Sequence, residues 1–97
     1  EKVHAHYGRG LLQYRLGRFK EARVDFERAR ALEPGHAPAH YGLGLIAIQE
    51  GHVAEAIAHY REAIRHSPDW TDARAALEHA LSLDRKGQAR ETEIRHG

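Results

Sequence analysis

Hydrophobic residues along the chain recur at the three- and four-residue spacing of helices, and glycine and proline interrupt this spacing at regular places. The pattern predicts helices over residues 4–16, 19–32, 38–50 and 53–66, and a fifth helix over residues 69–86. Gly17 and Gly51 follow the first and third helices, where a left-handed backbone commonly ends a helix. Pro34 and Pro68 follow the second and fourth, because the residue before a proline is pushed out of the helical region. We therefore expect two helical hairpins and one further helix.

The two hairpins repeat one another at a spacing of 34 residues. Pairing residues 3–36 with residues 37–70 gives eleven identities, whereas unrelated segments of ordinary composition would share roughly two. The identical pairs are Ala5/Ala39, His6/His40, Tyr7/Tyr41, Gly8/Gly42, Gly10/Gly44, Leu11/Leu45, Gly17/Gly51, Glu21/Glu55, Ala22/Ala56, Ala29/Ala63 and Pro34/Pro68. A fixed period of this length indicates stacked helix-turn-helix units rather than one globular core.

The repeat fails within the fifth helix, where Arg85 stands 34 positions beyond Gly51. We therefore predict a repeat domain over residues 1–86, with units at 3–36 and 37–70 and a capping helix at 69–86, for which Asp69 is the N-cap candidate. Residues 87–97 form a charged tail that we expect to fray.

These residues resemble the tetratricopeptide repeat family over residues 3 to about 84. The pattern reads Tyr7, Gly10, Gly17, Phe19, Ala22, Phe26, Ala29 and Pro34 in the first unit and Tyr41, Leu43, Gly44, Gly51, Val53, Ala56, Tyr60, Ala63 and Pro68 in the second. His6 and His40 depart from it, since the family usually carries a large aromatic residue there. The resemblance implies an all-α solenoid that winds as a right-handed superhelix, in which small residues let helices approach closely and Phe26 and Tyr60 fill the seam. It also implies a concave groove lined by the first helix of each unit, which binds peptides or partner proteins and seldom performs chemistry.

If the first helices line a groove, its residues can be read at helical spacing. We expect an apolar and aromatic lining with a shallow glycine-floored slot. The residues are Tyr7, Gly8, Leu11 and Tyr14, then Tyr41, Gly42, Leu45 and Ile48, with Ala75, His79 and Ser82 from the fifth helix. Such a groove suits an apolar helical or extended segment of a partner protein.

Other occupants remain open. The groove residues could pack against the chain's own tail or a flanking segment, or a second copy could fill the groove and make the protein a self-assembling scaffold subunit. Some members of the family clamp a C-terminal carboxylate with polar side chains, but apolar Tyr7 and Leu11 stand where such groups would be needed.

Arginines in the first unit replace apolar residues of the second. Arg9, Arg23 and Arg30 correspond to Leu43, Ile57 and Ile64. Unpaired buried guanidinium groups would be prohibitive, so this flank must be solvated or paired, and Glu27 is placed to pair with Arg23 at four-residue spacing. Two interpretations follow. The arginines could make the outer face of a terminal unit soluble, with no further repeat before residue 3, or they could form a patch for an anionic partner.

Nine histidines raise the question of a metal site. The candidate groups are His4 with His6, His36 with His40, and His52, His59 and His66 along the fourth helix. No carboxylate or cysteine completes these groups in the sequence pattern, so we expect no metal and no cofactor. Catalysis is not expected either, since the chain lacks cysteine, a phosphate-binding loop and a histidine placed to activate a serine.

The composition excludes some classes of partner but does not identify one. A formal net charge of +1 provides no global field for nucleic acid or an anionic membrane, and no apolar run approaches the roughly 20 residues of a membrane span. The absence of cysteine suits the cytosol and the bacterial periplasm equally. The first residue is Glu1 rather than methionine, which we interpret as a processed or excised chain.

Overall fold

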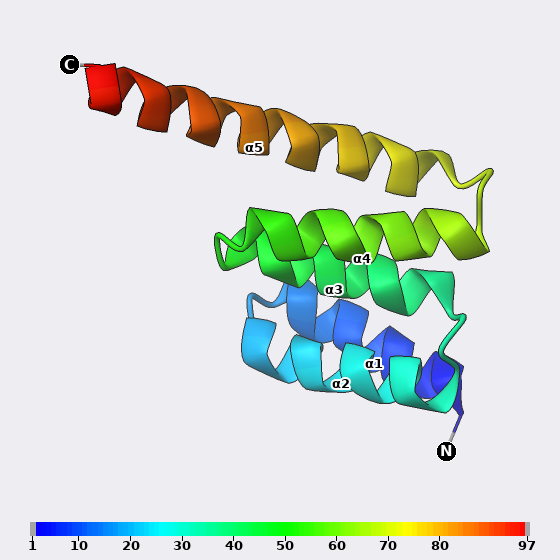
Figure 1. Cartoon of the computed structure of the whole chain (residues 1–97). Coiled ribbons are helices and arrows are strands. Elements are labelled where there is room, and N and C mark those ends of the chain that lie inside the picture. Colours follow the sequence, from blue (N-terminus) through cyan, green and yellow to red (C-terminus); the bar gives the residue numbers. More distant parts are fainter. Residues whose placement is uncertain (1, 97) are drawn as a thin grey trace.

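A computed structural model gives the backbone of residues 2–96 and the side chains of residues 2–87, and those residues form five helices and no strand (Figure 1). The helices are α1 (Val3–Arg15), α2 (Phe19–Leu32), α3 (Ala37–Gln49), α4 (Val53–His66) and α5 (Thr71–His96). Each helix packs mainly on its neighbours in sequence, so α1 and α2 form one hairpin, α3 and α4 the next, and α5 lies along α4. The expected all-α repeat architecture is confirmed.

The two hairpin turns close in the same way. Gly17 and Gly51 have φ angles of 77° and 79°, a region that side chains with a Cβ rarely adopt. After α1, the Arg18 N–H donates to the Gln13 carbonyl at 2.8 Å, and after α3 the His52 N–H donates to the Ala47 carbonyl at the same distance. These are the bonds of a Schellman motif, so one short sequence signal reverses the chain in both units.

The helix ends mostly fall within two residues of the predicted positions, but α5 is an exception. It continues through Lys86 and Gly87 to His96, so the prediction that the helix ends at about Lys86 is wrong. A single glycine in a helix costs about 1 kcal/mol and does not by itself end it. The helix begins at Thr71, which leaves Asp69 in the preceding turn rather than at the N-cap.

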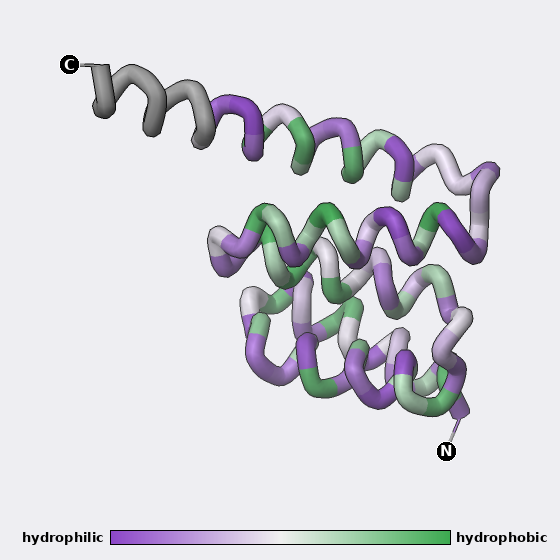
Figure 2. Tube along the Cα trace, in the orientation of Figure 1, coloured by the Kyte–Doolittle hydropathy of each residue, from purple (hydrophilic) through white to green (hydrophobic). Residues whose placement is uncertain are grey.

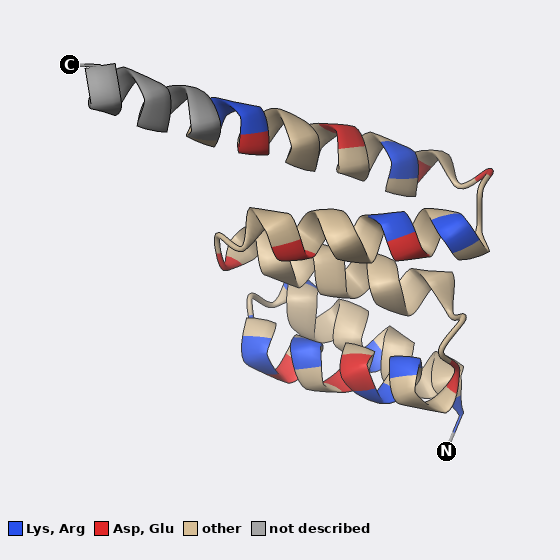
Figure 3. Cartoon of the chain, in the orientation of Figure 1, with Lys and Arg blue, Asp and Glu red and all other residues tan. Residues whose placement is uncertain are grey.

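The core is a row of small clusters between neighbouring helices. One contains Ala22 and Phe26 of α2 with Leu43 and Ile46 of α3, and the next joins Tyr60 of α4 to α3 and α5. The small residues Ala22, Ala29, Ala56 and Ala63 are fully buried. Apolar residues are concentrated on the central helix α3, which carries no charged side chain (Figures 2 and 3). Such local packing is what stacked units require, because each contacts only its neighbours.

None of the helices in the described residues combines the length and the apolar composition that crossing a membrane requires.

Candidate functional site

A tyrosine in each hairpin makes the same two kinds of ring contact. Tyr7 lies 5.9 Å from Phe26 and 5.4 Å from His36, and Tyr41 lies 5.9 Å from Tyr60 and 4.8 Å from Trp70, measured between ring centroids. The partners are themselves 34 residues apart, so the tyrosine of each unit packs on its own second helix and on the segment that leads into the next unit. Each of the two tyrosine rings therefore contributes packing contacts to the fold.

The predicted groove side chains of α1 and α3 are all partly buried. They are Tyr7, Leu11, Tyr14, Tyr41, Leu45 and Ile48. Five of the six pack against a core cluster of the described structure, and Leu45 is the exception. The two helices are joined at this face by the Gln49 amide, which donates to the Tyr14 hydroxyl at 3.5 Å. We call these six side chains the α1–α3 face.

Two phenol groups of this face, those of Tyr7 and Tyr41, have raised pKa values. Burial raises the pKa of Tyr7, and the nearby Tyr41 acts in the same direction. Burial also raises the pKa of Tyr41, with further contributions from Asp72 and Tyr14. Neutral phenols add hydrogen-bonding capacity to an apolar surface without adding charge.

The two glycines predicted to form a slot differ in their surroundings. Gly8 is exposed, and a Cβ placed there would meet nothing within 4 Å. Gly42 is buried, and a Cβ there would lie 2.8 Å from ring atoms of Phe26. The prediction of a glycine-floored slot is therefore wrong at Gly42, because a side chain from α2 covers its backbone. His79 lies exposed on α5.

The three arginines that replace apolar residues of the second unit are each paired with a carboxylate. Arg9 contacts the buried Asp25 at 2.9 Å, Arg23 contacts Glu50 and Glu55, and Arg30 contacts Glu27. Arg23 does not pair with Glu27, as the spacing had suggested.

Arg23 also reaches carboxylates of the second unit rather than pointing outward, so the interpretation that it keeps an outer face soluble is wrong. Burial is the largest single influence on the pKa of Arg23 and lowers it, but hydrogen bonds and attraction from Glu50 and Glu55 together outweigh burial and raise the pKa. The pKa of Glu55 shifts the opposite way: burial raises it, but Arg23 and two neighbouring histidines outweigh that and lower it. The two carboxylates offset the positive charge of the Arg23 guanidinium, so this side chain would attract an external anion only weakly.

Histidines of the second unit meet across the hairpin. The His40 ring stacks on His66 at 5.9 Å and lies 6.3 Å from His59. Burial lowers the pKa of His59. The Glu62 carboxylate lies near the rings of His40 and His66. One ligand atom from each of the three residues lies within 4.8 Å of the other two, so together they could hold a metal ion. The prediction that no carboxylate completes a histidine group is therefore wrong. The four-residue spacing of Glu62 and His66 was visible in the sequence, but the approach of His40 from another helix was not.

The comparisons with known proteins agree with the fold. A model of the tetratricopeptide repeat family matches residues 1–29 and 7–69, which together cover more than half of the chain. The chain therefore belongs to the tetratricopeptide repeat family. No curated protein matches it. Repeats of this family generally mediate protein–protein interactions and are typically non-catalytic.

Proposed function

We propose that this protein is a non-catalytic interaction module whose α1–α3 face binds an apolar helical or extended segment of a partner protein. The observation that carries the proposal is that six uncharged side chains from two successive units are only partly buried. Its membership of a family that binds protein partners supports the same conclusion.

The chemistry of the face selects the ligand. Its side chains are aromatic or aliphatic, and α3 carries no charge over its whole length. Apolar side chains at helical or extended spacing could exclude water from such a surface, while the neutral tyrosine hydroxyls of Tyr7 and Tyr41 hydrogen-bond to a peptide backbone. Arg9, Arg23 and Arg30 are less available to an acidic segment, because each is already paired with a carboxylate.

The experiment is selection of peptides from a displayed library on the 97-residue chain, followed by titration calorimetry. We expect apolar peptides to be enriched and Leu45→Ala to weaken their binding by about 1 to 2 kcal/mol. Leu45 is the residue to change because it does not pack on a core cluster of the described structure, so its loss should leave the helix content unchanged. Leu32→Ala is the matched control, since Leu32 is an exposed leucine of α2 outside the face.

Peptides that bind the Leu45→Ala variant as tightly as the wild type would contradict the proposed site. Sedimentation of both proteins over a concentration series tests whether a second copy of the chain occupies the face. A wild type that associates and a Leu45→Ala variant that stays monomeric would show a second copy on the α1–α3 face instead of a partner.

A further inference from the structure

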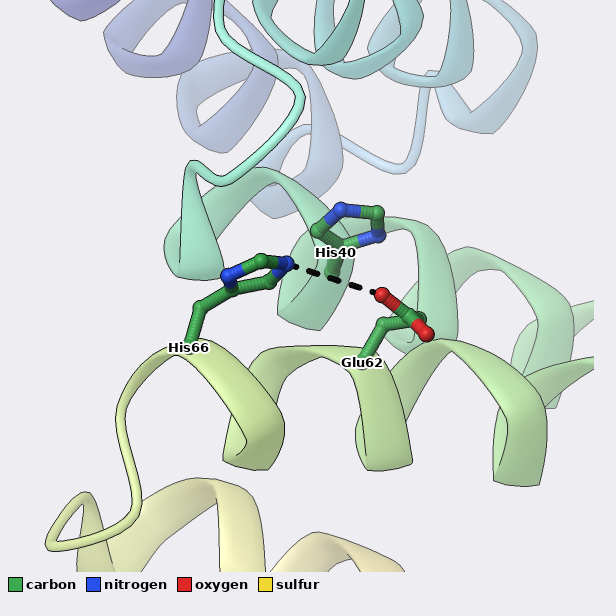
Figure 4. Close-up of side chains that lie close together, drawn as sticks. All are labelled: His40, Glu62 and His66. Carbon is green, nitrogen blue, oxygen red and sulfur yellow. Dashed lines mark ion pairs between the residues drawn. The ribbon is translucent and has the colours of Figure 1, made fainter.

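Three potential metal ligands converge between the first turns of α3 and the last turns of α4. Figure 4 shows His40 on α3 facing Glu62 and His66 on α4. One ligand atom from each residue lies within 4.8 Å of the other two. His66 Nε2 lies 3.6 Å from Glu62 Oε2. The group therefore joins two helices of one hairpin and not merely neighbouring turns.

His40 is the least ordinary member of the group. Only 6% of it is exposed, and its Nε2 lies 2.8 Å from the Pro34 carbonyl, to which it donates. Its buried Nδ1 has no hydrogen-bond partner among the described residues. Donation from Nε2 fixes the tautomer in which Nδ1 carries a lone pair. A buried acceptor without a partner is unfavourable, and one nitrogen of the ring faces Glu62 in Figure 4.

The same arrangement is common around protein metal ions. A metal-ligating histidine usually donates its other ring N–H to a backbone carbonyl or carboxylate, which fixes the ring and makes the ligand nitrogen more basic. The Pro34 carbonyl does this for His40. From these observations we propose that His40 Nδ1, Glu62 and His66 bind a divalent transition-metal ion, with Zn²⁺ as the expected occupant.

The ligand types select the class of ion. Two imidazoles and one carboxylate form a nitrogen-rich set that suits Zn²⁺, Ni²⁺ or Cu²⁺, whereas Mg²⁺ and Ca²⁺ prefer oxygen ligands. At usual zinc distances, tetrahedral ligand atoms lie about 3.4 Å apart. The pair formed by His66 and Glu62 is already close to this value. Their side chains are 29% and 46% exposed, so they are free to move toward the fixed ring of His40.

A second histidine and carboxylate group on α4 provides a contrast. Glu55 lies 3.3 Å from His52 and 3.7 Å from His59. Its carboxylate is paired with Arg23 at 3.4 Å, and a cation in contact with a ligand opposes the binding of another. Glu62 has a more distant and more exposed arginine neighbour, Arg65, at 3.7 Å. The exposed His52 therefore serves as the matched control for the proposed site.

Binding would have a consequence for the fold. An ion held by His40 on one side and by Glu62 and His66 on the other connects α3 to α4. Because the unfolded chain does not hold these ligands together, the ion stabilises the folded state in proportion to its concentration.

The test is titration of the 97-residue chain with Zn²⁺ alone, with Glu62→Gln, His66→Gln and His52→Gln as variants. We expect wild type and His52→Gln to bind with the same affinity and to gain the same increase in Tm. Glu62→Gln and His66→Gln should each weaken binding at least about tenfold, because even indirect supports of a metal site contribute this much. Co²⁺ in place of Zn²⁺ should give the strong visible absorption of a tetrahedral site, which both variants lose.

Glu62 and His66 are partly exposed, so we expect neither substitution to reduce the helix content measured by circular dichroism. If one substitution reduces the helix content, the zinc affinity of the other variant tests the proposal. Wild-type affinity in a folded Glu62→Gln or His66→Gln variant would overturn the proposal, as would an equal loss of affinity in His52→Gln.

Discussion

The two seams between successive units use different chemistry at equivalent positions. In the first, Phe26 of α2 packs with Leu43 and Ile46 of α3, all fully buried. In the second, Tyr60 of α4 packs with Ala80 of α5, while Leu77 is only partly buried. The first seam therefore interlocks large side chains, whereas the second brings a large residue against small ones.

The rims of the seams differ as well. Arg23 crosses the first seam to the carboxylates of Glu50 and Glu55, while the equivalent Ile57 packs against the apolar cluster of the second. Equivalent repeat positions therefore place their side chains at equivalent seams, but they do not specify whether the contact made there is an ion pair or apolar packing. The neighbouring unit decides between an ion pair and apolar contact, and the following variants test this difference.

The largest effect should come from the equivalent leucines. Leu43→Ala should reduce the free energy of unfolding by about 2 to 4 kcal/mol, because it removes a fully buried side chain and leaves a cavity. Leu77→Ala should cost about 1 kcal/mol, since that side chain is partly in water already. Urea unfolding followed by circular dichroism measures both, and equal losses would show that the seams are equivalent.

Glycine substitutions at equivalent positions should have opposite signs. Gly42→Ala places a Cβ 2.8 Å from the Phe26 ring, so overpacking should cost about 1 to 3 kcal/mol. Gly8→Ala meets nothing within 4 Å on an exposed face of α1 and should stabilise the helix by about 0.5 to 1 kcal/mol. Thermal unfolding of the two variants beside wild type checks the signs. A stabilising Gly42→Ala would mean that Phe26 does not hold the first seam closed.

The smallest effect concerns the ion pair at the rim. A double-mutant cycle of Arg23→Ala and Glu50→Ala should give a coupling free energy of about 0.5 to 1 kcal/mol, because both side chains are partly exposed. Salt should reduce this coupling, whereas Ile57→Ala should have an effect that changes little with salt. A coupling free energy of zero at low salt would show that Arg23 does not link the two units.

The sequence alone predicted the hairpins because their signals are local. Gly17 and Gly51 fix left-handed turns, and Pro34 and Pro68 restrict the residue before them, whatever the rest of the chain does. The 34-residue repeat then placed equivalent side chains on equivalent faces. It also led to the prediction that the six side chains of the α1–α3 face line a groove, and both that groove and its role in binding stay proposals.

Contacts between units were decided only by the tertiary structure. Gly8 and Gly42 share one motif, yet only Gly42 lies beneath a ring from the preceding hairpin. The partners of Arg23 are 27 and 32 residues away, and a rule for neighbours on one helix selects Glu27 instead. His40 meets Glu62 and His66 because α3 and α4 fold back on each other. Periodicity along a chain determines the face of a helix, but the residue opposite that face depends on how whole helices pack.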